Sequence, residues 1–124
     1  KAVSTRPEEA EYRDGLGRAY AKLEKYEEAS TAFTEAMRLN PLSAKHHGNL
    51  ASLRLLMKDK KGAYEEFLKA LKIDPDYAHA LYFAGLLNYQ DGELETAKKY
   101  WGELLKLHPN HERAKDVEQK MAGL

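Results

Sequence analysis

A segment of thirteen residues recurs three times in this chain at a fixed interval. The copies are residues 29–41 (ASTAFTEAMRLNP), 63–75 (AYEEFLKALKIDP) and 97–109 (AKKYWGELLKLHP), and each starts 34 residues after the one before. A period in this range indicates a repeat array, in which each unit buries its apolar face only by stacking on the next. The period therefore predicts a stack of similar units.

Each copy of the segment predicts a short amphipathic helix. In the middle copy, Ala63, Phe67, Ala70 and Leu71 follow one another in steps of four, three and one, which places them on one helical face. Charged residues cover most of the opposite face. Each copy ends with a proline, which restricts the residue before it and cannot continue a helix.

The sequence between the copies is also helical in pattern, so the predicted fold class is all-α. Seven helices are expected, with Ser43, Asp76 and Asn110 as N-caps of the third, fifth and seventh: residues 7–23, 27–39, 44–57, 62–73, 77–89, 93–107 and 111–122. The connections are short, so neighbouring helices are expected to pack antiparallel. A polar lead-in, residues 1–6, precedes them, and 1–124 is the size of one ordinary domain.

The composition excludes several classes of function. Twenty basic and 20 acidic side chains give a net charge of zero, which argues against a general nucleic-acid binder. The chain has no cysteine, so disulfides and thiolate metal sites are excluded. No apolar run of 18 residues is present, so membrane insertion is not expected. No signal peptide is visible, and a cytoplasmic location is favoured, with an extracytoplasmic one left open in case a signal has been removed.

The 34-residue helix–turn–helix unit resembles the tetratricopeptide repeat. The family pattern falls on Leu16, Gly17, Tyr20, Ala29, Phe33, Ala36 and Pro41 in the first unit, on Leu50, Ala51, Ala63, Phe67, Ala70 and Pro75 in the second, and on Ala84, Gly85, Ala97, Trp101 and Pro109 in the third. The sequence departs from the pattern at Arg54 and Asn88, which stand where Tyr20 stands in the first unit, and at Leu104.

The resemblance implies a right-handed superhelical solenoid of antiparallel helix pairs. Its repeats are residues 10–43, 44–77 and 78–111, and the last helix, at 111–122, starts like a fourth unit. Glu118 and Gln119 take the places of Leu16 and Gly17 there, so this helix is expected to be a polar cap over the third unit.

No catalytic motif is present, so no enzyme activity is predicted. The five histidines are spread over different faces and turns, and no metal or other cofactor is expected. The carboxylate pairs, such as Glu65 and Glu66, are interpreted as parts of solvent-exposed helix faces.

The resemblance also implies that the first helix of each unit lines a concave groove that takes a peptide or helix of a partner protein. The predicted groove residues are Arg18, Lys22, Lys45, Asn49, Ser52, His79, Tyr82, Phe83, Leu86 and Tyr89. The three cationic side chains, Arg18, Lys22 and Lys45, are expected to orient acidic groups of the ligand. The last four residues form an aromatic and apolar stripe, which is expected to be a binding surface. The alternative interpretation is that part of the stripe belongs to the core.

A subset of this family grips the free carboxylate of acidic chaperone tails. The places of its five gripping residues hold Asp14, Arg18, Asn49, His79 and Phe83 here, and only Asn49 matches. Asp14 is expected to repel a carboxylate, so no binding of such tails is predicted.

A second functional hypothesis is homo-oligomerisation through the open ends of the stack. The first helix presents Tyr12 and Ala19 toward the place that a preceding unit would take. This face is expected to meet either a neighbouring unit or a second copy of the chain.

Overall fold

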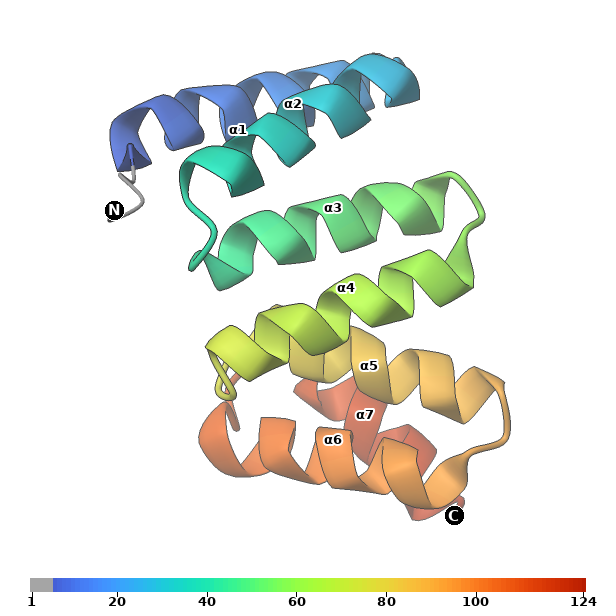
Figure 1. Cartoon of the computed structure of the whole chain (residues 1–124). Coiled ribbons are helices and arrows are strands. Elements are labelled where there is room, and N and C mark those ends of the chain that lie inside the picture. Colours follow the sequence, from blue (N-terminus) through green and yellow to red (C-terminus); the bar gives the residue numbers. More distant parts are fainter. Residues whose placement is uncertain (1–5) are drawn as a thin grey trace.

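The computed structural model describes residues 6–124; most of the lead-in, residues 1–5, lies outside the described part. The all-α prediction is confirmed, since this part contains seven α-helices and no strand (Figure 1). They are α1 (Pro7–Lys22), α2 (Tyr26–Leu39), α3 (Ala44–Leu56), α4 (Lys60–Ile73), α5 (Ala78–Gln90), α6 (Leu94–Leu107) and α7 (Ala114–Ala122). Among the described residues, no helix combines the length and the apolar character needed to cross a membrane.

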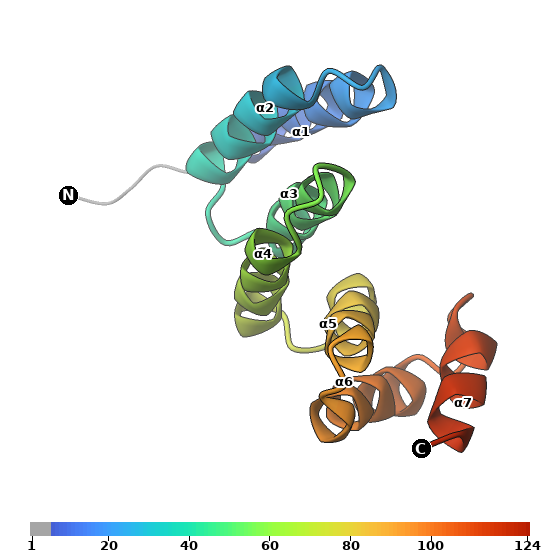
Figure 2. The same cartoon turned by 90° about the vertical axis from the view of Figure 1, so that its right-hand side faces the viewer.

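The helices form antiparallel pairs, α1 with α2, α3 with α4, and α5 with α6, and the pairs stack into a curved array. Along the array, α1, α3, α5 and α7 lie on the inner side of the curve, and α2, α4 and α6 lie on the outer side (Figure 2). Side chains of α1 and α3 meet directly across the inner surface.

The turn inside each pair has the same backbone geometry. A residue with positive φ stands at the same repeat position each time: Glu24 (φ 61°), Lys58 (φ 67°) and Gly92 (φ 78°). Glycine adopts this left-handed conformation without steric cost, whereas a residue with a Cβ loses about 1 kcal/mol or more there. The array therefore keeps the turn geometry even where the residue does not favour it.

Helix starts differ from the prediction at two of the three expected caps. The Ser43 hydroxyl accepts a hydrogen bond from the His46 amide at 3.4 Å, as expected of an N-cap. Asp76 is not a cap, because its own amide donates to Asp74 and α5 begins two residues later. Similarly α7 begins at Ala114 and not at residue 111, since a turn occupies the residues between Pro109 and the helix.

Small residues let the two helices of a pair approach closely. A Cβ atom on Gly17 would lie 2.6 Å from the ring of Phe33, and one on Gly85 would overlap the indole of Trp101. Both aromatic side chains are buried, and the Trp101 Nε1 donates to the backbone carbonyl of Tyr82 at 3.0 Å. The aromatic ring of the second helix thus lies directly on the backbone of the first.

Replacing Gly85 by alanine is expected to lower the free energy of unfolding by about 2 kcal/mol, because the new methyl group overlaps the fully buried indole of Trp101. Gly102→Ala is the matched control. Gly102 lies within α6, and a methyl group there would have no contact within 4 Å beyond its chain neighbours and the backbone of its own helix, so alanine is expected to stabilise the chain by up to about 1 kcal/mol. Urea unfolding of both variants measures the difference; equal effects would contradict the close approach.

Candidate functional site

The inner surface of the array contains a cleft between α1 and α3. It has a volume of about 200 Å³, and its lining is Arg18, Ala21, Lys22, Phe33, Asn49, Ser52, Leu53 and Leu56. Leu56 is an exposed apolar side chain at its edge, with 54 % of its surface accessible. The cleft therefore combines an apolar floor with two cationic side chains from α1, and it brings together four of the ten predicted groove residues.

A buried carboxylate lies beside this cleft, at the contact between α1 and α3. The Asp14 side chain has no accessible surface, and three nitrogen atoms donate to it. Asn49 Nδ2 reaches Oδ1 at 2.8 Å and Oδ2 at 3.0 Å, Arg18 Nε reaches Oδ2 at 3.2 Å, and His46 Nδ1 reaches Oδ1 at 3.1 Å. A carboxylate only accepts, so Nδ1 of His46 carries a proton. Both oxygens of Asp14 are thus fully used inside the protein.

The environment keeps Asp14 ionised. Burial alone would raise its pKa, but the hydrogen bonds from His46 and Asn49 and the charges of His46 and Lys45 outweigh burial. The pKa of Asp14 is consequently held below its ordinary value. The sequence-based expectation that Asp14 faces a ligand as a free negative charge is therefore incomplete, because its charge is already neutralised from within.

The three predicted cations differ in their availability. Lys45 Nζ lies 2.6 Å from Glu11 Oε1, so this ammonium already has a carboxylate partner. The Arg18 guanidinium is held by Asp14 through Nε, while 59 % of its side chain stays accessible. Lys22 is exposed and has no ion-pair partner among residues 6–124. Lys22 and the outer edge of Arg18 are thus the positive groups that a ligand in the cleft can meet.

Ser52 and His79 meet in the middle of the inner surface. The Ser52 Oγ and His79 Nε2 atoms are 2.8 Å apart, and the imidazole contacts the ring of Phe83 edge-on at 4.9 Å. Burial, followed by the positive charges of His111 and Arg113, lowers the pKa of His79 below its ordinary value. His79 is therefore neutral at pH 7 and joins α3 to α5.

The prediction that Tyr82 is an exposed groove residue is wrong. Only 4 % of its surface is accessible. The Arg113 guanidinium, just before α7, lies 4.9 Å from the centre of its ring and donates to its hydroxyl at 3.1 Å. Tyr82 also packs with Trp101 in the apolar cluster that α7 covers. The alternative interpretation, in which part of the stripe is core, applies to this residue.

The rest of the stripe is half-buried. Phe83 is stacked on Phe67 at 5.3 Å between ring centroids, and Tyr89 lies 5.2 Å from Trp101. Leu86 packs against the same cluster as Tyr82. These three side chains contact the core on one side and keep part of their surface accessible, so whether a partner uses them stays a prediction.

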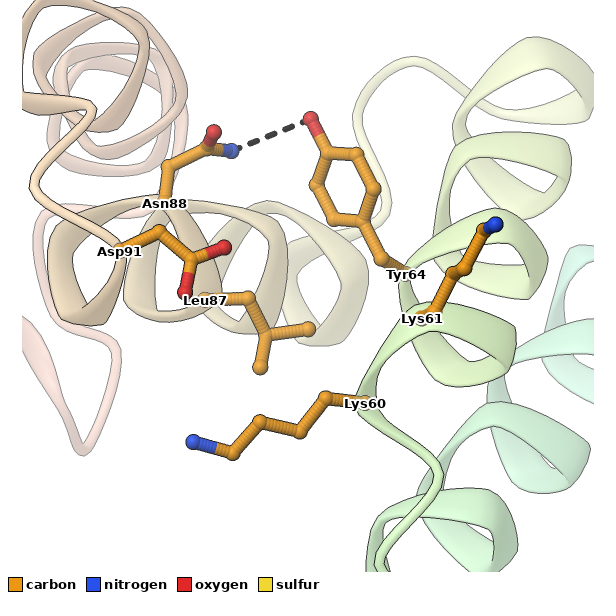
Figure 3. A pocket seen from close by; sticks show the side chains of 6 residues that line it. All are labelled: Lys60, Lys61, Tyr64, Leu87, Asn88 and Asp91. Atoms are coloured by element: carbon orange, nitrogen blue, oxygen red, sulfur yellow. Dashed lines mark hydrogen bonds between the residues drawn. The ribbon is translucent and has the colours of Figure 1, made fainter.

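A larger pocket that the sequence analysis missed lies between α4 and α5. Its volume is about 330 Å³, and Lys60, Lys61, Tyr64, Leu87, Asn88 and Asp91 line it. Figure 3 shows the Asn88 amide directed at the Tyr64 hydroxyl, to which it donates at 3.1 Å. The departure of Asn88 from the repeat pattern was the available signal, because a smaller side chain there leaves space between the pairs. No cluster of three or more metal-ligating side chains occurs among residues 6–124.

Glu66 is a second buried carboxylate, and its assignment to a solvent-exposed face is wrong. It is 5 % exposed, and His47 Nδ1 and Lys69 Nζ lie 2.8 Å and 3.3 Å from its oxygens. Burial would raise the pKa of Glu66, but these two hydrogen bonds and the charges of their donors outweigh it and lower the pKa. The pairing with His47 closes the space between α3 and α4.

Comparison with known proteins identifies the repeat. A family model described as tetratricopeptide repeat matches residues 15–78 and 61–112. Hsp70-Hsp90 organizing protein 1 of Glycine max is 27 % identical over 100 residues; the match covers 81 % of this chain, which spans only 18 % of the length of that relative.

Solved structures share the architecture over almost the whole chain. The first tetratricopeptide repeat domain of Spaghetti (RPAP3), bound to the HSP90 peptide SRMEEVD, is 25 % identical to this chain with a TM-score of 0.87. The match covers 98 % of this chain and 97 % of that one. The first domain of human RPAP3 is 26 % identical with a TM-score of 0.79, covering 95 % and 96 %. The translocator chaperone SycD of Yersinia enterocolitica, at 17 % identity and a TM-score of 0.84 over both whole chains, shares the fold.

Replacing Glu66 by glutamine is expected to lower the free energy of unfolding at pH 7 by about 2 kcal/mol, because a buried charged acceptor is lost. Because the pKa of Glu66 is lowered in the folded chain, its carboxylate stabilises the fold at pH values above 4.5, the ordinary pKa of a glutamate. This contribution is lost as the pH falls below 4.5 and through the lowered pKa. The difference between the two chains should therefore shrink from pH 4.5 downward. Urea unfolding at several pH values measures it.

The control for this prediction is Glu95→Gln, since the Glu95 side chain is 92 % exposed. The free energy of unfolding of this control variant should equal that of the unmodified chain at every pH. A Glu66→Gln difference that stays constant down to pH 3 would contradict the buried pairing.

Proposed function

The chain belongs to the tetratricopeptide repeat family, and we propose that it is a protein-interaction adaptor that holds a segment of a partner protein in its concave groove. The observation that carries the proposal is the cleft between α1 and α3, with its apolar floor and positive edge. The structure of Spaghetti (RPAP3) with an HSP90 peptide supports a peptide-binding role, because its likeness extends over nearly the whole chain.

The chemistry of the cleft favours a ligand with an apolar side chain next to an acidic one. The apolar side chain would cover Leu56, which is 54 % exposed, and burial of apolar surface contributes about 25 cal/mol per Å². The acidic group would meet Lys22 and the accessible edge of Arg18. Since the stacked helices hold the backbone of these residues in place before binding, little backbone ordering of the protein opposes association.

The predicted groove extends from this cleft toward α5. Ser52 and His79 are joined by a hydrogen bond at the middle of the groove, and Phe83, Leu86 and Tyr89 follow it on α5. Two of these side chains are aromatic and one is aliphatic. A partner segment that lies across all three helices would thus pass from a positive cleft to an apolar surface, which fixes the direction in which it binds.

A non-catalytic role is part of the same proposal. The Ser52 and His79 contact has the distance of a nucleophile and its base, but a working base is oriented by a third group. No carboxylate is hydrogen-bonded to His79 among residues 6–124. The pair instead links two units of the array.

Self-association through the first pair is the second candidate. Tyr12 is 64 % exposed, whereas the residues at the same repeat position in the next units, His46 and Ala80, have no accessible surface. A pocket of about 250 Å³ lies between α1 and α2 nearby, and Arg13 Nε there is buried without a hydrogen-bond partner among residues 6–124. A mass in solution that rises with concentration would support this second role.

Replacing Leu56 by glutamate is expected to abolish capture of a groove partner, because it puts a charge into the apolar part of the cleft. The matched control is Leu42→Glu: Leu42 is 75 % exposed but lies outside the cleft, in the turn before α3. Affinity capture from a lysate of the source organism, with quantitative mass spectrometry, compares the two variants. The captured amount of a partner that the Leu42 variant retains should fall roughly tenfold or more with the Leu56 variant. A tenfold loss of affinity corresponds to about 1.4 kcal/mol of binding free energy. Equal capture by both would place the site elsewhere.

The peptide SRMEEVD is expected not to bind this chain with micromolar affinity. Asn49, the one gripping residue that matches, already donates to both oxygens of Asp14, and Arg18 is held by the same carboxylate. Phe83 stands where the subset uses a cation. Isothermal titration calorimetry with the peptide measures the affinity, and the first domain of human RPAP3 can be titrated alongside for comparison. Saturable micromolar binding to this chain would refute the expectation.

A further inference from the structure

The nitrogen atoms around Asp14 have the arrangement of a receptor for a carboxylate. An Asn amide spans both oxygens, a guanidinium reaches one, and an imidazole N–H reaches the other. Such charge-assisted hydrogen bonds to a carboxylate are among the strongest that proteins form. We propose that the Asp14 side chain is a built-in ligand, which fills a carboxylate-binding site between α1 and α3 and thereby determines which partners the groove accepts.

The repeat itself provides the first argument, because it does not require an acid at this position. The residues that correspond to Asp14 in the second and third units are Gly48 and Tyr82, 34 and 68 positions further on. Both units have the same helix pair as the first. The carboxylate is therefore not part of the repeat pattern. Its three donors occur together only at the contact between the first and second units.

The location of the donors provides the second argument. Arg18 and Asn49 line the cleft as well as contacting Asp14, so the buried carboxylate adjoins the surface where a partner is proposed to lie. Asp14 has no accessible surface, whereas 59 % of the Arg18 side chain is accessible. Removal of the carboxylate would leave its donors facing a small cavity that opens toward the cleft.

The consequence for specificity rests on the proposed function. A partner whose carboxylate must reach Asn49 would have to displace Asp14, and that would leave an ionised group buried without its hydrogen bonds. A ligand that presents an uncharged group at this place meets no such cost. The built-in ligand therefore selects for segments that carry their acidic group further along, toward Lys22.

The test is chemical rescue of Asp14→Gly by acetate, which has the size of the deleted side chain and supplies its carboxylate. At pH 7.5 the variant should unfold at a lower temperature than the unmodified chain, and about 100 mM acetate should raise its midpoint by about 5 °C more than the same concentration of chloride. Differential scanning calorimetry and far-ultraviolet circular dichroism provide the readout. If the variant is unfolded in chloride, recovery of helix signal on addition of acetate is the corresponding result.

Two controls separate a carboxylate site from general stabilisation by salt. Asp14→Asn keeps the volume of the side chain, so no space for acetate opens, and its midpoint should not respond beyond the effect of chloride. Acetamide, which has the shape of acetate without the charge, should not rescue Asp14→Gly. A variant that is folded and insensitive to acetate, or unfolded and not recovered by it, would overturn the proposal. Because no partner protein takes part, this outcome is independent of whether the groove binds one.

Discussion

The close approach of the two helices in each pair is the constraint on which the rest of the structure depends. It requires a small residue in the first helix, at Gly17, Ala51 and Gly85, and a buried aromatic ring in the second, at Phe33, Phe67 and Trp101. The rings extend beyond their own pair: Phe33 packs with Leu50 and Leu53 of the next unit, and Phe67 packs with Leu87. The same ring therefore holds the pair together and joins it to its neighbour.

This arrangement leaves several positions on the inner side of α1, α3 and α5 outside the apolar core. Apolar burial takes place between pairs, so the inner positions can change without loss of the core. They differ accordingly from unit to unit: Arg18 in the first corresponds to Ser52 in the second and to Leu86 in the third. A regular scaffold thus presents a surface whose chemistry changes along its length, and this is the property that an adaptor needs.

The fold was predictable because a period of 34 residues fixes many positions at once. Helix starts depend on single side chains, and there the prediction was less accurate: Asp76 lies in a turn that Asp74 stabilises, and α7 begins later than expected. The groove was harder still to predict. Whether Tyr82 is exposed depends on Arg113, which lies 31 residues further along the chain and reaches its ring from outside the repeat pattern.

Buried polar groups explain the remaining differences. A pattern of apolar and charged residues places Asp14 and Glu66 at the surface, because charged side chains are rarely buried without partners. Both are buried here, since donors from neighbouring helices surround them: Asn49 and His46 for Asp14, and His47 for Glu66. Pairing across units cannot be read from the spacing within one helix, so the sequence gives no local signal for it.

The contact between α1 and α3 consequently differs in kind from the other contacts between units. Alongside the apolar contacts of Phe33, it contains a charged cluster in which Asp14 is bonded to one residue of its own helix and two of the next unit. Hydrogen bonds have defined directions, whereas apolar contacts tolerate sliding, so this cluster fixes the angle between the first two pairs more strictly than packing alone would. The groove takes its shape from that angle. The residues that set the chemistry of the cleft therefore also set its geometry, and a substitution at Asp14 changes both together.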